Sequence, residues 1–230
     1  MNDHTAPQDI STEAVLFAHQ FATLVSAGMN LVSCLEILAL EAPAPYAAAM
    51  PDVRARIMEG QSLSQAIQDL PTLFPTFFRM MIRSGEAGGI LDIALKQTAE
   101  VLEEDWTLAL MLGTQPLLMT YEPESPASRL TIFLFCRIWG MMLSSGVPIL
   151  TAMETAAEVL PVAHRMQVLA ARDVIKNRGS FEEIVAPMTF LPESARKMFI
   201  VGGQTGTLDT LLLKAAELYR YQLRYERQRA

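Results

Sequence analysis

The stretch Arg79-Met-Met-Ile-Arg-Ser-Gly-Glu-Ala-Gly-Gly-Ile-Leu-Asp92 returns later in the chain as Arg196-Lys-Met-Phe-Ile-Val-Gly-Gly-Gln-Thr-Gly-Thr-Leu-Asp209. Both versions keep the leading arginine, the glycines that are four residues apart, and the final Leu-Asp. A helix that is followed by a glycine turn and a second helix fits this pattern, because glycine adopts left-handed backbone conformations at little cost. The recurrence predicts that the chain contains the same helical unit twice.

Other blocks recur in the same order and at nearly the same offset. Leu24-Val-Ser-Ala-Gly-Met-Asn-Leu31 precedes the first version, and Met142-Leu-Ser-Ser-Gly-Val-Pro-Ile149 precedes the second. The offset between the two copies is more than twice the roughly 20–50 residues of a solenoid repeat. This offset argues against a generic helical-repeat adaptor. We expect a first domain at 12–113, a linker at 114–127 with two prolines, and a second domain at 128–228.

Each copy is predicted to be all-α, so that the chain forms two tandem six-helix bundles related by internal duplication. Phe17, Phe21 and Leu24 recur at helical spacing. Ser62-Leu-Ser-Gln65 and Ser180-Phe-Glu-Glu183 both fit a capping box that opens a short helix. Turns between helices are expected at eight glycines: Gly28, Gly60, Gly85, Gly89, Gly146, Gly179, Gly202 and Gly206.

The composition narrows the class of function. The 230 residues are 51% hydrophobic and carry a formal net charge of −7, whereas a general nucleic-acid binder needs an excess of Lys and Arg. The longest uncharged stretch is interrupted by polar residues and Gly28, so we predict no membrane-spanning helix. The basic end at Arg220–Arg229 leaves contact with anionic headgroups open as a second interpretation.

Sequence motifs for catalysis, cofactors or metals are not found, and we predict a protein that is not an enzyme. Cys34 and Cys136 have no metal-ligand spacing and are expected to be buried. Glu86, Asp92 and Asp209 are the candidate partner-binding residues. They could meet a basic partner or a hard cation such as calcium, although helix capping is the favoured interpretation.

Three features together resemble the F domain of type II secretion systems. They are Ser26-Ala-Gly-Met-Asn-Leu31, Gly60-Gln-Ser-Leu63, and Phe74-Pro75 followed by Gly85-Glu-Ala-Gly-Gly-Ile-Leu-Asp92. The resemblance covers nearly the whole chain, and the second copy departs from it at Gly203, where the pattern has glutamate. In that family the domain occurs twice in the inner-membrane platform protein of type II secretion and type IV pilus machines. Each family domain is a six-helix bundle that faces the cytoplasm.

The resemblance implies a scaffold that docks other machine components through its helix faces. The implied partners are an assembly ATPase, inner-membrane or cytoplasmic adaptor proteins, and pilin-like subunits; self-association stays open. The implied location is the cytoplasm, at the inner face of the inner membrane. A soluble regulatory or sequestering protein with the same fold is the alternative function.

Overall fold

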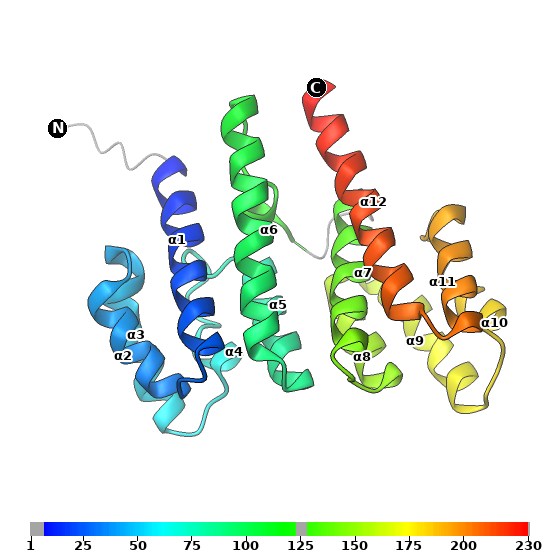
Figure 1. The fold of residues 1–230 in the computed structure, drawn as a ribbon, viewed down its shortest axis with the longest axis horizontal. Helices are drawn as coiled ribbons and strands as arrows, with labels where there is room; N and C mark the ends of the chain where they lie inside the picture. The colour runs from blue at the N-terminus through cyan, green and yellow to red at the C-terminus, as the bar shows by residue number, and fades with distance from the viewer. Residues whose placement is uncertain (1–6, 123–127, 230) are drawn as a thin grey trace. The chain divides into compact units, whose positions relative to one another are not determined.

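The structure is a computed structural model that describes residues 7–122 and 128–229. These residues form twelve α-helices and two short 3₁₀ segments and contain no strand. The helices divide between two compact units, Met1–Tyr121 and Glu122–Ala230, with six helices in each (Figure 1). The predicted fold class, all-α with two six-helix bundles, is therefore confirmed.

The first unit contains a 3₁₀ segment, η1 (Leu118–Thr120), after its six helices. These helices are α1 (Pro7–Ser26), α2 (Leu31–Glu41), α3 (Ala44–Met58), α4 (Leu63–Ala66), α5 (Thr76–Gly88) and α6 (Leu91–Leu112).

The second unit repeats this order, with a 3₁₀ segment, η2 (Ala157–Val159), after its second helix. Its helices are α7 (Arg129–Ser144), α8 (Ile149–Ala156), α9 (Val162–Lys176), α10 (Phe181–Val185), α11 (Glu193–Thr205) and α12 (Leu208–Arg229).

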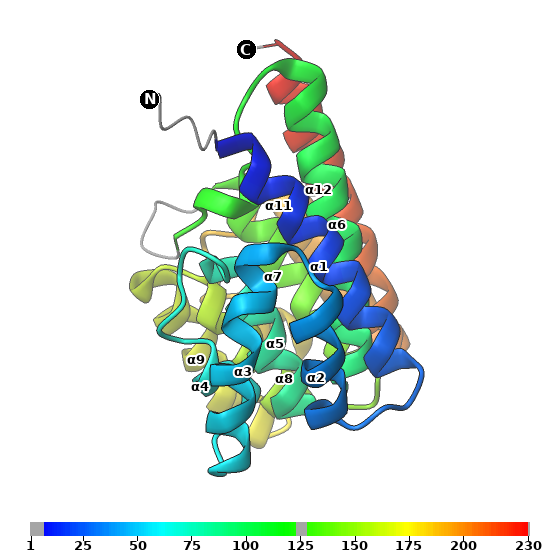
Figure 2. The same cartoon turned by 90° about the vertical axis from the view of Figure 1, so that its left-hand side faces the viewer.

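The first and last helices of each unit lie side by side and run antiparallel (Figure 1). In the first unit this pair is α1 and α6, and in the second it is α7 and α12. Figure 2 turns the first unit toward the viewer, so that α2 can be followed between its two neighbours, α1 and α3. Both last helices have 22 residues, which is longer than the other helices of their own units.

An aromatic cluster forms the core of the first unit. The ring of Phe17 stacks on Tyr46 with centroids 4.3 Å apart, and Phe74 packs against both rings edge-on. The Tyr46 hydroxyl donates a 2.8 Å hydrogen bond to the backbone carbonyl of Leu73. Burial raises the pKa of Tyr46, and the hydrogen bond satisfies its polar end inside an apolar core.

The second unit keeps part of this ring arrangement: Phe135 meets Phe190 edge-on, with centroids 5.9 Å apart, as Phe17 meets Phe74 in the first unit. Trp139 of α7 meets Phe199 of α11 edge-on, with centroids 5.6 Å apart. His164 packs against Phe190, and it follows the N-cap Pro161 of α9 at the same distance in sequence as Tyr46 follows the N-cap Pro43 of α3. The two cores therefore share a framework and one edge-on phenylalanine pair, and they differ in the other rings.

Two glycines expected at turns lie inside helices instead. Gly85 is in the last turn of α5, where a Cβ would come within 2.6 Å of the Ala94 side chain and 3.0 Å of the Leu91 Cα. Gly202 of α11 is in the equivalent position, where an added Cβ would lie 2.9 Å from the Leu208 Cα. Their role is the close approach of the next helix. The left-handed turns themselves are made by Gly89 and Gly206.

The other predicted turn glycines divide by conformation. Gly28, Gly60 and Gly146 have positive φ, whereas Gly179 does not, because Arg178 takes the left-handed conformation there with φ of 57°. Gly179 instead lies close to the Val174 side chain, with no room for a Cβ.

The predicted limits of the first domain and linker differ from the structure at two places. Helix α1 begins at Pro7, ahead of the expected start at residue 12. Within the expected linker at 114–127, the segment η1 packs on α5, and Leu118 and Tyr121 are buried. The Asp105 carboxylate accepts a 2.7 Å hydrogen bond from the Leu118 amide. These contacts attach the first part of the linker to the first unit, and residues 123–127 lie outside the described residues.

The variants Gly28→Val and Gly146→Val are expected to lose about 1 kcal/mol or more of unfolding free energy each. Both glycines have positive φ, at 79° and 83°, and an added Cβ meets nothing within 4 Å. The cost therefore comes from backbone conformation alone. Urea denaturation measures it, with Gly28→Asn as the control because asparagine tolerates this conformation better. Unchanged stability in both valine variants would contradict the assignment.

Candidate functional site

Glu86 is a capping residue within the first unit. Its carboxylate accepts hydrogen bonds from the backbone amides of Leu63 and Ser64 at 2.5 and 3.1 Å, and a third from the Ser64 hydroxyl. These amides belong to the first turn of α4, where backbone donors lack helical partners. Glu86, which was a candidate partner-binding residue from the sequence, therefore joins α5 to α4 through these hydrogen bonds.

The second unit replaces this bridge with a packed ring. Gly203 stands where Glu86 stands in the first unit, and the Phe181 ring lies so close that a Cβ on Gly203 would be 2.1 Å away. Beside it, the Gln204 amide donates a hydrogen bond to the Glu182 carboxylate. The substitution of glutamate by glycine is thus matched by a large apolar residue on α10.

Asp92 and Asp209 lie in the first turns of α6 and α12, as the sequence predicted. Asp92 is exposed and Asp209 is half-buried. A carboxylate in a first helical turn is stabilised by the helix dipole and nearby amides. Asp92 stands at the start of α6 in the first unit, and Asp209 stands at the start of α12 in the second unit.

The residues with the most reactive side chains take part in packing or surface contacts. Cys34 and Cys136 are buried free thiols, and burial raises the pKa of both. His19 lies 3.0 Å from Glu103 at the surface of the first unit. Across the described parts of the chain, no group of three or more His, Cys, Asp or Glu residues could hold a metal ion.

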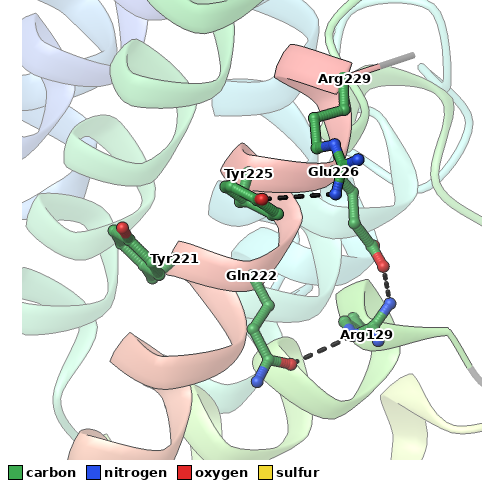
Figure 3. A pocket seen from close by; sticks show the side chains of 6 residues that line it. All are labelled: Arg129, Tyr221, Gln222, Tyr225, Glu226 and Arg229. Carbon is green, nitrogen blue, oxygen red and sulfur yellow. Dashed lines mark hydrogen bonds and ion pairs between the residues drawn. The ribbon is translucent and has the colours of Figure 1, made fainter.

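A pocket of about 670 Å³ lies in the second unit between the start of α7 and the last turns of α12. We call it the α12 groove, and six residues line it: Arg129, Tyr221, Gln222, Tyr225, Glu226 and Arg229. Figure 3 shows Gln222 and Glu226 pointing toward Arg129, while Tyr221 and Tyr225 project from another side of α12.

Polar contacts hold the α12 groove in shape. The Arg129 guanidinium forms an ion pair with Glu226 and donates a 3.1 Å hydrogen bond to the Gln222 side chain. The Arg229 guanidinium lies 5.5 Å from the centre of the Tyr225 ring and donates to its hydroxyl. A cation over an aromatic face is favourable. Arg129 and Arg229 are therefore both held in place by contacts with residues of α12.

Exposed aromatic rings make the α12 groove a candidate interaction surface. The exposed fraction is 70% for Tyr221 and 51% for Tyr225, and Leu218 is exposed one turn earlier. Tyrosine and arginine are enriched in protein interfaces, where they contribute much of the binding energy. The exposed Leu218, Tyr221 and Tyr225 form an apolar stripe along α12, and Arg129 and Arg229 line the groove beside it. This combination favours binding of another macromolecule.

Among the described residues, no helix combines the length and the apolar character needed to cross a membrane.

The fold and the groove define an all-helical protein with two six-helix units and an exposed aromatic surface at the end of its last helix. The family described as "Type II secretion system (T2SS), protein F" matches residues 17–115 and 135–230. The chain belongs to this family. The first matched segment begins within α1 and ends just after α6, and the second begins within α7 and includes α8 to α12.

Relatives include proteins of both secretion and pilus systems. The chain is 24% identical to the type II secretion system protein F of Vibrio cholerae over 295 residues, which is 90% of this chain and 73% of that protein. It is 24% identical to the type IV pilus assembly protein PilC of Myxococcus xanthus over 298 residues, 90% of this chain and 70% of that one. It is 32% identical to protein F of Pseudomonas aeruginosa over 93 residues.

The alignments also reveal a difference in length. The stretch aligned with the Vibrio protein has 295 residues, whereas this chain has 230 in total. The relative therefore contains additional residues inside the aligned stretch that have no counterpart here.

The variant Glu86→Ala is expected to lower the unfolding free energy by about 1–3 kcal/mol, because hydrogen bonds to a charged group are lost and two amides of α4 lose their acceptor. Thermal and urea unfolding measure the loss. The control is Asp92→Ala, which removes an exposed carboxylate from a first helical turn and should cost less. A smaller loss for Glu86→Ala than for Asp92→Ala would contradict the capping role.

Proposed function

We propose that the protein is a non-enzymatic scaffold component of a type II secretion or type IV pilus machine. The observation that carries this proposal is the family match in both units, together with relatives named for secretion and for pilus assembly. The scaffold works by binding: its two helical bundles offer separate faces, on which other machine components dock.

We propose the α12 groove as one docking face, with an assembly ATPase as its partner. Tyr221 and Tyr225 supply exposed apolar area, and Arg129 is held in place by its contacts with α12. Side chains fixed in this way lose little conformational freedom on binding, which favours affinity. Asp92 and Asp209 are secondary candidates for partner contacts. Adaptor proteins and pilin-like subunits are the other partners that the proposal includes.

Removal of the two rings tests the docking face. In the intact chain, Tyr221→Ala combined with Tyr225→Ala is expected to weaken binding to the cognate assembly ATPase at least tenfold, because exposed tyrosines that anchor an interface each contribute about 1 kcal/mol or more. Isothermal titration calorimetry measures the affinity, and the melting temperature is expected to stay near that of the parent.

The matched control is Leu16→Ala, which removes an exposed apolar side chain from α1 in the first unit. Its affinity for the ATPase is expected to equal the parent value. If the intact chain binds neither the ATPase nor another component of the machine, the scaffold proposal is wrong.

A regulatory or sequestering protein of the same fold is the second candidate function. The observation that favours it is the additional sequence inside the aligned stretch of the Vibrio relative, which this chain does not contain. The scaffold proposal places the protein in the cytoplasm at the inner face of the inner membrane. Recovery of the natural gene product with the membrane fraction favours the scaffold, and recovery free of membranes favours the regulator.

A further inference from the structure

The two units carry formal charges of opposite sign. Residues 1–121 contain 14 Asp and Glu against 5 Lys and Arg, a charge of −9, whereas residues 122–230 contain 11 and 13, a charge of +2. The first unit therefore repels an acidic ligand, and such a ligand is held best where cations outnumber carboxylates in the second unit. Complementary charge of this kind determines which partner a surface accepts.

The α12 groove is the place in the second unit where cations gather. The last ten residues of α12, Arg220–Arg229, contain four arginines and one glutamate, and Arg129 of α7 adds a fifth arginine. Two of these five arginines form ion pairs within the unit, Arg129 with Glu226 and Arg220 with Glu217. The other three give the end of α12 its excess of positive charge: Arg224, Arg227 and Arg229.

Two of these cations border the apolar stripe of Leu218, Tyr221 and Tyr225. The spacing of three and four residues places the stripe on one side of α12. At about 100° of rotation per residue, Arg224 and Arg229 fall on opposite sides of the stripe, and both are exposed. A ligand that covers the tyrosine rings therefore meets a cation at each edge.

The groove has the dimensions of a short helical segment. Its lining residues on α12 extend from Tyr221 to Arg229, which is roughly 12 Å at 1.5 Å per residue. About two turns of a partner helix have this length, and side chains spaced by three and four residues share one face of such a helix. An amphipathic helix that lies along an apolar groove is a common mode of peptide recognition.

We infer that the α12 groove binds a short amphipathic helix of a partner protein, with Asp or Glu beside its apolar face. The apolar side chains of that helix cover Tyr221 and Tyr225, and its carboxylates meet Arg224 and Arg229. Arginine and carboxylate form paired hydrogen bonds that are stronger than those between neutral groups. The inference rests on the proposed docking role of the groove and specifies the chemistry of the segment that docks.

The shape of the groove favours a protein segment over a membrane surface. A layer of anionic headgroups reaches the exposed arginines and rings, but it does not enter the hollow between α7 and α12. Figure 3 shows Gln222 and Glu226 pointing toward Arg129 on this side, where their contacts fix a pattern of polar groups. Side chains of a helix can enter the hollow and meet this pattern.

Fluorescence anisotropy with labelled synthetic peptides tests the inference on the intact chain. The probe is a helical peptide of about 16 residues, with Leu at intervals of three and four residues and Glu on both sides of that face. A second peptide has Gln in place of every Glu. We expect the acidic peptide to bind at least tenfold more tightly than the Gln peptide, and the difference to shrink as the salt concentration rises.

Charge reversal in the protein locates the binding site. Arg224→Glu combined with Arg229→Glu is expected to weaken binding of the acidic peptide at least tenfold and to leave the helical circular dichroism signal unchanged. The matched control is Lys176→Glu combined with Lys197→Glu, which changes the net charge equally at exposed positions of α9 and α11. Its affinity should stay near the parent value. A peptide with Lys in place of every Glu should prefer the arginine variant to the parent.

Equal binding of the acidic and Gln peptides overturns the inference, as does an equal loss of affinity in the arginine variant and its control. Binding to phosphatidylglycerol vesicles without binding of the acidic peptide also overturns it, and assigns the surface to a membrane. The scaffold proposal can fail separately. If the assembly ATPase binds the parent and the arginine variant equally, only the acidic segment is wrong. If the acidic peptide binds as expected but no machine component does, the inference is supported and the scaffold proposal fails.

Discussion

The close approach of the last two helices in each unit is the constraint on which the rest of the bundle depends. Helix α5 can fold back onto α6 only because Gly85 has no side chain: a Cβ there would lie 2.6 Å from that of Ala94. The turn is closed by hydrogen bonds from the amides of Ile90 and Gly89 to the last carbonyls of α5. In this way α6 is positioned along α1, whose Phe17 belongs to the aromatic core. Gly202 and Gly206 repeat the arrangement for α11 and α12.

On this shared framework the two units have different contacts. Glu86 bridges α5 to α4 through backbone amides, whereas the second unit fills the same place with the Phe181 ring against Gly203. The core tyrosine of one unit has a histidine at the equivalent place in the other. The exposed sides of α3 and α9 likewise differ in size, because α9 exposes Val162 and Met166 where α3 exposes Ala44 and Ala48. Duplication followed by such paired changes keeps each bundle folded while it gives the chain different surfaces to present to partners.

The sequence was sufficient for the architecture because the features that determine helices are local. The spacing of Phe17 and Phe21, the capping boxes at Ser62 and Ser180, and the turn glycines all act within a few residues. Contacts between distant residues were harder to predict. Nothing near Glu86 indicates that it caps a helix more than twenty residues earlier, so capping was expected only in general terms. The α12 groove likewise needs Arg129 beside Gln222, which only the fold brings together. The basic residues at the end of the last helix were the one feature of the sequence that drew attention to this surface.

Native-state hydrogen exchange of the intact chain, followed residue by residue, tests most directly whether this glycine contact determines each bundle separately. In Gly85→Leu, which forces apart α5 and α6, the account predicts that slow-exchanging amides of α1 and α6 lose protection together. Those of α7 and α12 keep the protection that they have in the parent chain. Loss confined to the turn itself, or spread equally over both units, would contradict the central claim that one close helix approach organises each unit on its own.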